Sequence, residues 1–198
     1  PPFEGREEAN LILGTDLLEH PEKAEGANNI VIVGGGVVGC ETAHWLANEY
    51  GKNVTVLEML PHFMMGVCTA NRGHLLHYLE KSGVRLYNCT KVKALAKDGV
   101  YVEQNQSQTV PDPYNTWQPL LPPNIPNPME KAIKEEIVEK KIPADLIVLA
   151  MGGKADETFF FEAGEEHLAK EIYNIGDSSR AGRVLEAVRG AYHLAVRI

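Results

Sequence analysis

Apolar, β-branched runs alternate with helical periodicity in the N-terminal part of the chain. Two such runs, Asn29–Val33 and Asn53–Leu57, predict buried strands, because strands covered on both faces are continuously apolar. Between them, apolar residues recur at helical spacing and predict a helix from Val37 to Tyr50, which Gly51 terminates. The succession of strand, helix and strand predicts a parallel βαβ unit, and therefore an α/β fold.

Further elements are expected on both sides of this unit. Two segments that alternate in polarity are joined by Asp98-Gly99, a strong turn signal, and predict a β-hairpin. The predicted elements are a short strand at Asn10–Gly14, a helix over about Thr69–Lys81, a strand at Val84–Tyr87, and hairpin strands at Lys91–Lys97 and Val100–Glu103.

The C-terminal part of the chain is less regular. Glu130–Lys141 fits either a strand or a helix, and we predict a strand because it leads through Pro143 into the apolar strand Asp145–Ala150. A further strand is predicted at Glu171–Ile175, and a final helix from about Val184 to Ile198.

A proline-rich insert interrupts this pattern over residues 105–128. Residues 111–128 contain seven of the twelve prolines in the chain, together with Trp117. Proline lacks the backbone donor that a helix interior or a central strand requires. We therefore expect a surface excursion, which either binds a partner domain or covers the surface of its own domain.

Composition narrows the class of protein. The formal net charge is −8 and acidic and basic residues are mixed, which argues against nucleic acid or a membrane surface as a partner. No apolar run approaches the roughly 20 residues that span a bilayer.

The chain has three cysteines, Cys40, Cys68 and Cys89, which are odd in number and form no C-x-x-C pair. We therefore expect reduced thiols in a cytoplasmic protein. We expect each of the three to be a small buried apolar residue. Cys40 has an alternative, because it lies at a helix start, where the helix dipole can lower its pKa.

The first residues carry neither a start methionine nor a signal peptide. Pro1-Pro2-Phe3-Glu4-Gly5 has no charged segment followed by an apolar one. We expect the chain to be a piece of a longer protein.

A glycine-rich motif follows the first buried strand. Gly34-Gly35-Gly36-Val37-Val38-Gly39 fits G-x-G-x-x-G between a strand and a helix, which is the dinucleotide-binding pattern of a Rossmann unit. Gly34 permits the tight turn, Gly36 lets a pyrophosphate approach the backbone, and Gly39 allows close helix packing. The helix N-terminus then offers N–H groups to the phosphates.

Two glutamates extend this motif. Glu58 ends the second strand, where its carboxylate can bind the adenosine ribose and repel the 2′-phosphate of NADPH. No arginine follows it directly, so we favour NADH. Glu41 completes G-x-G-x-x-G-x-E; we expect it to be buried near the helix start, either facing a nicotinamide or serving only a local role there.

Other polar patterns are weaker. Gly176-Asp177 follows an apolar segment and precedes a helix, where the Asp can accept from ligand hydroxyls or simply cap the turn. His74, His77 and Glu80 share a helix face, but no further ligand set converges on them, so we expect no metal site. We find no nucleophile–base–acid set, and expect no catalytic residue and no complete reaction in this chain.

As a series, these motifs resemble the C-terminal part of NADH:flavin oxidoreductases, the multidomain relatives of old yellow enzyme and 2,4-dienoyl-CoA reductase. The residues that carry the resemblance are G-G-G-V-V-G-C-E, V-T-V-L-E-M-L-P, the apolar strand before Met151-Gly152-Gly153, and Y-N-I-G-D. The stretch F-M-M-G-V-C-T-A-N-R-G-H-L-L-H-Y-L-E-K and the insert N-T-W-Q-P-L-L-P-P-N-I-P-N-P resemble 2-enoate reductases most closely.

The resemblance implies a Rossmann-like FAD/NAD(P)-binding fold with three layers (ββα), a parallel sheet and an antiparallel β-meander. Residues 29–153 would form the NADH-binding domain, while residues 1–28 and 154–198 would be flanking pieces of an FAD-type domain. The implied cofactor-binding residues are Gly34, Gly35, Gly36, Val37, Val38, Gly39, Glu41, Glu58, Met59, Met151, Gly152, Gly176 and Asp177.

The resemblance also implies partners and cofactors outside this chain. The partners would be the protein's own N-terminal TIM barrel, which would carry FMN, and the other half of the FAD domain. A [4Fe-4S] cluster would follow the barrel. The chain would accept NADH and pass its hydride to FAD for reduction of an activated C=C bond. Alternatives are a flavin disulfide reductase relative and a non-catalytic dinucleotide-binding module. We expect the isolated chain to be inactive, to lack FAD, and to be capable of forming a homo-oligomer.

Overall fold

The computed structural model describes residues 3–117, 121, 125, 127–128 and 131–198. The chain divides into two compact units, Pro1–Met151 and Gly152–Ile198, which are described separately below. Within the described residues, no helix has both the length and the apolar character that crossing a membrane requires.

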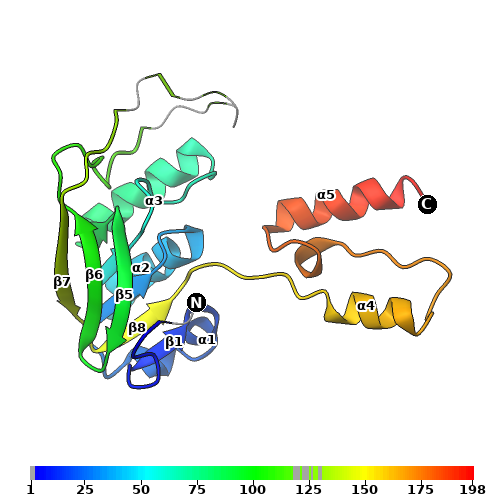
Figure 1. Ribbon diagram of the computed structural model, residues 1–198, viewed down its shortest axis with the longest axis horizontal. Helices are drawn as coiled ribbons and strands as arrows, with labels where there is room; N and C mark the ends of the chain where they lie inside the picture. The colour runs from blue at the N-terminus through cyan, green and yellow to red at the C-terminus, as the bar shows by residue number, and fades with distance from the viewer. Residues whose placement is uncertain (1–2, 118–120, 122–124, 126, 129–130) are drawn as a thin grey trace. The chain divides into compact units, whose positions relative to one another are not determined.

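A five-stranded parallel sheet lies at the centre of the first unit (Figure 1). Ile32 of the middle strand is in register with Val56 on one side and Val148 on the other. In sheet order the strands are β1 (Leu11–Leu13), β8 (Leu146–Leu149), β2 (Asn29–Val33), β3 (Asn53–Leu57) and β4 (Arg85–Tyr87).

Helices cover one face of this sheet. Alternate strand residues such as Ile32 and Val56 point to this face and form a buried cluster with Leu46 and Leu76 of the helices. The helical elements of the unit are α1 (Gly14–Glu19), η1 (Pro21–Ala24), α2 (Val37–Tyr50) and α3 (Thr69–Lys81).

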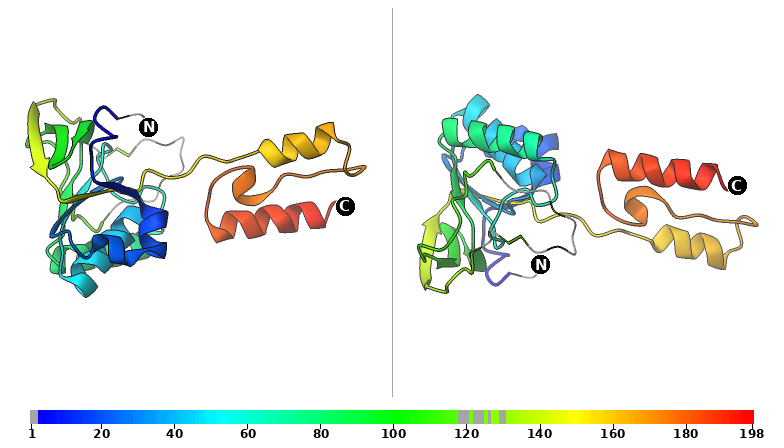
Figure 2. Two further views of the ribbon diagram at one scale, coloured as in Figure 1. Left: turned by 90° about the horizontal axis from the view of Figure 1, so that it is seen from below. Right: turned by 90° about the horizontal axis from the view of Figure 1, so that it is seen from above.

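A three-stranded antiparallel sheet covers the opposite face. It consists of β5 (Thr90–Ala96), β6 (Gly99–Asn105) and β7 (Ile137–Pro143). The intervening strand residues, among them Val31 and Leu57, pack there against Val100 and Val102. Figure 2 shows the helices and the antiparallel sheet on opposite sides of the parallel sheet. The predicted α/β class with three layers is therefore confirmed.

The start of the proline-rich insert is anchored along the edge strand β4. The Tyr114 hydroxyl donates to the carbonyl oxygen of Val84 at 2.6 Å and accepts from the Leu86 N–H at 3.2 Å. The Asn88 side-chain amide donates to the carbonyl oxygen of Pro111 at 2.8 Å. These bonds pair backbone groups that an edge strand would otherwise leave to solvent. Residues 118–120, 122–124 and 126 of the predicted excursion lie outside the described residues.

The second unit contains α4 (Thr158–Glu165), η2 (Gly176–Ser178) and α5 (Val184–Ala195). Ala163 is its one buried residue. Large apolar side chains, including Val184 at 80% exposure, remain open to solvent on α5. A segment with so little buried surface has too small a core to fold stably by itself.

Three predictions are corrected by the structure. Glu171–Ile175 is not a strand, because no neighbouring strand in the described part of the chain pairs with it. The strand predicted over Glu130–Lys141 begins only at Ile137. Ile137 pairs with Asn105, the last residue of β6, so the described residues before Ile137 have no partner strand. Glu130 itself lies outside the described residues. The final helix ends at Ala195 instead of Ile198.

The N-terminal segment belongs to the same sheet as the βαβ unit. β1 pairs in parallel with β8, Ile12 opposite Val148. The border between the two compact units falls after Met151. The assignment of residues 1–28 and 154–198 to an FAD-type domain concerns the whole protein and stays a prediction.

The difference in burial leads to a prediction about autonomous folding. We expect a polypeptide of residues 1–151 to unfold cooperatively on heating, because both of its cores are complete within that range. A polypeptide of residues 152–198 should show no cooperative transition. Circular dichroism melting curves measure both, and a sharp transition in the shorter polypeptide would contradict the burial argument.

Candidate functional site

In the turn between β2 and α2, backbone atoms leave no room for a side chain at Gly34 or Gly39. Gly34 has φ +116°, and a Cβ atom there would collide with the backbone carbonyl of Ala150. A Cβ atom at Gly39 would collide with the carbonyl oxygen of Gly34. The tight turn and the close helix approach predicted for these two glycines are therefore observed.

Gly36 differs, because the space beside it is open. Apart from its neighbours along the chain, no atom of the described residues lies within 4 Å of the position that a Cβ would occupy, and the residue is exposed. Gly36 is also the N-cap residue of α2 and provides no side-chain cap. The first N–H groups of a helix have no carbonyl partner within the helix, and they attract anions. The turn therefore presents an uncovered helix N-terminus.

Glu58 is fixed beside this opening by the backbone that surrounds it. One carboxylate oxygen accepts from the Gly35 N–H at 2.7 Å and the other from the Leu60 N–H at 2.8 Å. The Glu58 N–H donates to the carbonyl oxygen of Tyr87 at 2.8 Å, which ties the residue to the end of β4. Each carboxylate oxygen retains a lone pair for a further donor, such as a sugar hydroxyl.

Phe63 lies over the buried side of the turn and is fully buried itself. A Cβ atom on Gly35 would collide with its ring, and the Met64 N–H donates to the carbonyl oxygen of Gly35 at 2.8 Å. The loop after β3 thus contacts Gly35 through both Glu58 and Phe63.

Sequence reasoning missed Phe63 and a second buried residue, Arg72. Arg72 occupies the buried face of α3 together with Leu76 and Leu79. Its spacing to these leucines, four and seven residues, is the signal that could have identified it, because a charged residue on an apolar face needs a specific partner.

One expectation about α2, the burial of Glu41, is wrong, and another, the burial of Cys40, is confirmed. Glu41 is exposed and not buried, because its position on the helix turns away from the sheet. Cys40 is fully buried, and burial, reinforced by the nearby carboxylates of Glu58 and Glu41, raises the pKa of its thiol to about 12. The helix dipole therefore does not make Cys40 a reactive thiolate.

Apolar side chains are exposed near the glycine turn. Met59, which directly follows Glu58, is 66% exposed, Val38 in the first turn of α2 is 48% exposed, and Met151 at the end of this unit is 36% exposed. Exposed apolar side chains beside an anion-binding helix end are typical of a site for a ligand with both phosphate and ring systems.

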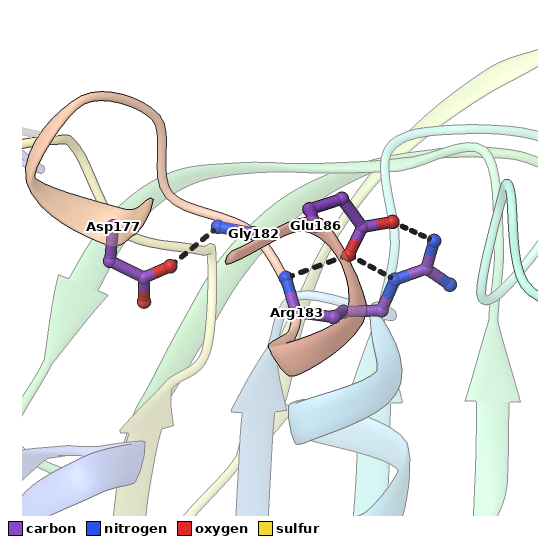
Figure 3. Close-up of polar contacts among 4 residues, drawn as sticks. All are labelled: Asp177, Gly182, Arg183 and Glu186. Atoms are coloured by element: carbon purple, nitrogen blue, oxygen red, sulfur yellow. Dashed lines mark hydrogen bonds and ion pairs between the residues drawn. The ribbon is translucent and has the colours of Figure 1, made fainter. Parts of the chain in front are cut away.

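The second unit contains its own hollow, of about 510 Å³, around the turn before α5. Asp177 accepts from the Gly182 N–H at 3.2 Å, and the Arg183 guanidinium pairs with Glu186 at 2.5 Å (Figure 3). The hydrogen bond from Arg183 lowers the pKa of Glu186 to about 2. Glu186 also accepts from the Arg183 N–H at 3.1 Å and caps the helix.

The predicted site residues thus fall into two groups. The first unit brings together the glycine turn, Glu58 and Met59 at the carboxyl ends of the strands, with Met151 following β8. Gly152, Gly176 and Asp177 belong to the second unit. Binding of a cofactor by these residues stays a prediction.

Comparison with known proteins gives a family match. The family model described as pyridine nucleotide-disulphide oxidoreductase matches residues 1–179. A bilirubin reductase from Mediterraneibacter gnavus is 27% identical over 97% of this chain and 24% of its own length. An NADH oxidase from Thermoanaerobacter brockii is 26% identical over 100% of this chain and 26% of its own length.

Solved structures agree with this result. A 2-naphthoyl-CoA reductase in complex with 2-naphthoyl-CoA is similar with a TM-score of 0.74 and 25% identity, covering 100% of this chain and 25% of that one. The chain therefore spans about a quarter of the length of the relatives that it matches.

The contrast between two glycines of the turn gives a stability prediction. Gly39→Ala should lower the free energy of unfolding by about 2 kcal/mol, because the new methyl group collides with backbone that cannot move aside. Gly36→Ala should cost about 1 kcal/mol or less, because its methyl group enters open space at an N-cap. Urea unfolding of both variants measures the difference, and equal costs would contradict the packing described for Gly39.

The cysteines differ in predicted reactivity. Cys68 is exposed, which corrects the expectation that it is buried, whereas Cys40 is buried with a raised pKa. Iodoacetamide at pH 8 should therefore alkylate Cys68 and leave Cys40 unmodified in the folded protein. Peptide mass spectrometry measures this, with urea-unfolded protein as the control in which both react. Rapid alkylation of Cys40 in the folded protein would contradict its burial.

Proposed function

The chain belongs to the pyridine nucleotide-disulphide oxidoreductase family, and on this basis we propose that it is the nucleotide-binding part of an NADH-dependent flavin enzyme that reduces an activated C=C bond. The observation that supports the proposal is the open space at Gly36, the N-cap of α2, directly after Gly35, whose N–H binds the Glu58 carboxylate. A diphosphate placed there meets unpaired N–H groups, and the adjoining ribose meets a carboxylate.

The identity of Glu58 favours NADH over NADPH. Its two oxygens are held by the N–H groups of Gly35 and Leu60, so the carboxylate cannot swing away from an incoming ligand. A 2′-phosphate would approach this fixed negative charge without a compensating arginine in Met59-Leu60-Pro61. The exposed Met59 supports the same assignment, since a flexible apolar side chain suits the adenine ring.

We propose that the second unit is half of an FAD site. Gly176 and the start of α5 line a hollow large enough for part of a dinucleotide. Asp177 directly follows Gly176 and is bound to the lining residue Gly182, and its carboxylate can accept from the hydroxyls of a ribityl chain. The exposed apolar face of α5 would pack against the remaining half of that domain. Bound FAD would supply the acceptor for the two electrons of the NADH hydride.

Reduction of a C=C bond is supported by the resemblance of the stretch from Phe63 to Lys81 to 2-enoate reductases. The similar proteins named as reductases of bilirubin and of 2-naphthoyl-CoA support a reductase as well. FMN and a [4Fe-4S] cluster in the rest of the protein would complete the electron path. The three cysteines of this chain are free, so a disulfide reductase would need its cysteine pair elsewhere.

The role of Glu58 can be measured by nucleotide affinity. Glu58→Gln should weaken NADH binding about tenfold, because a charged hydrogen bond to the ribose contributes about 1.5 kcal/mol or more. NADPH binding should not weaken, because the repulsion is removed with the charge. Isothermal titration calorimetry on the protein gives both affinities, and Glu49→Gln, an exposed carboxylate elsewhere on α2, is the matched control.

The overall activity requires the full-length protein. We expect it to oxidise NADH in the presence of an aromatic enoate such as cinnamate, whereas residues 1–198 alone should bind NADH without oxidising it and should purify without flavin absorbance. Absence of NADH binding to folded protein would refute the dinucleotide site. NADH binding with turnover of disulfides but not of enoates would support the disulfide reductase alternative.

A further inference from the structure

Arg72 is the one arginine of the parallel-sheet unit that is buried among the described residues, and the nucleotide-binding assignment leaves it without a role. It lies at 2% exposure on α3, behind the loop that follows β3. Among the described residues, no carboxylate lies within ion-pairing distance of its guanidinium. A buried cation with only neutral partners is costly, and such a residue is retained where its hydrogen bonds accomplish something specific.

The hydrogen bonds of Arg72 connect two segments that are distant in sequence. Its Nε donates to the carbonyl oxygen of Phe63 at 2.9 Å, and one terminal nitrogen donates to the carbonyl oxygen of Asn115 at 3.0 Å. The first acceptor belongs to the loop over the glycine turn, and the second to the start of the proline-rich insert. The planar guanidinium reaches both because its donors point in fixed, divergent directions.

The loop held by Arg72 is the loop that positions the nucleotide site. Phe63 packs on Gly35, whose N–H is bound by Glu58 and whose carbonyl oxygen accepts from Met64. A shift of the Phe63 backbone would therefore move the ring away from Gly35 and release the constraint on the Glu58 carboxylate.

The guanidinium also affects the electrostatics behind the turn. Burial lowers the pKa of Arg72, yet guanidinium groups stay protonated in proteins. Its charge acts on the buried thiol of Cys40, which lies in the first turn of α2. A positive charge buried behind a helix N-terminus adds to the attraction that this terminus exerts on a diphosphate.

We propose that Arg72 is a positioning residue for dinucleotide binding, which holds the loop from Glu58 to Phe63 against the glycine turn and connects that loop to the proline-rich insert. This inference rests on the proposed function, because it assumes that the glycine turn binds NADH. It assigns no contact between Arg72 and the ligand. Its specific consequence is that Arg72 determines how strictly Glu58 discriminates NADH from NADPH.

The discrimination between the two nucleotides separates this role from a merely structural one. A variant that only lowered the folded fraction would weaken the apparent binding of NADH and NADPH by the same factor. A variant that released Glu58 would weaken NADH binding and leave NADPH binding less affected, because the ribose contact and the repulsion are lost together. The ratio of the two affinities therefore reports on the position of the carboxylate.

The experiment compares Arg72→Met and Arg72→Lys in the full-length protein by calorimetric titration with NADH and with NADPH. We expect Arg72→Met to weaken NADH binding at least tenfold and to lower the NADH preference at least threefold. Arg72→Lys keeps the charge but reaches only one of the two carbonyl oxygens, so its losses should be intermediate. Arg85→Met, which removes an exposed charge on β4, is the matched control and should change neither quantity.

Each outcome is decisive. If Arg72→Met does not fold, Arg72→Lys is measured in its place. The proposal is overturned if Arg72→Lys weakens NADH binding by threefold or less and leaves the preference for NADH over NADPH unchanged. If the melting curve shows that Arg72→Met is folded, the same two observations on that variant also overturn the proposal. If the unaltered protein binds no NADH, the proposed function fails, and this outcome is distinguishable because it precedes any effect of substitution.

Discussion

The hydrogen bond between the Gly35 N–H and the Glu58 carboxylate, 2.7 Å long, joins the two halves of the βαβ unit at the point where its strands end. Gly35 lies in the turn between β2 and α2, and Glu58 follows the neighbouring strand β3. Because parallel strands place their carboxyl ends at one edge of the sheet, these two residues meet without any distortion of either strand. The bond fixes a negative charge beside an uncovered helix N-terminus.

This arrangement depends on tight packing behind the turn. Phe63 fills the space beside Gly35, and Gly39 brings α2 against the turn itself. A larger residue at either glycine would displace the turn, whereas Gly36 faces open space and is constrained only by what binds there. Close packing on the buried side and open space on the other side are what allow the turn to serve as the proposed binding surface as well as a connection.

The two units differ in how far they are complete. The first unit has two apolar clusters, one on each face of the parallel sheet, and needs no further chain to bury them. The second buries a single alanine and leaves the apolar residues of α5 exposed. The proposal that the second unit is half of an FAD site accounts for this difference, because the remaining half would cover the apolar face of α5.

The sequence by itself determined the βαβ unit, with β2, α2 and β3 at their predicted residues, because apolar periodicity and glycine turns are local signals. It also identified Gly34, Gly36, Gly39 and Glu58 as candidates, since their spacing encodes the turn geometry. Only the tertiary structure decided that Glu41 is exposed, that Glu171–Ile175 forms no strand, and that Arg72 is buried. The missing strand depends on a partner strand and the burial of Arg72 on loop carbonyls far away in sequence, while the exposure of Glu41 depends on which face of α2 packs against the sheet. No local pattern specifies these neighbours.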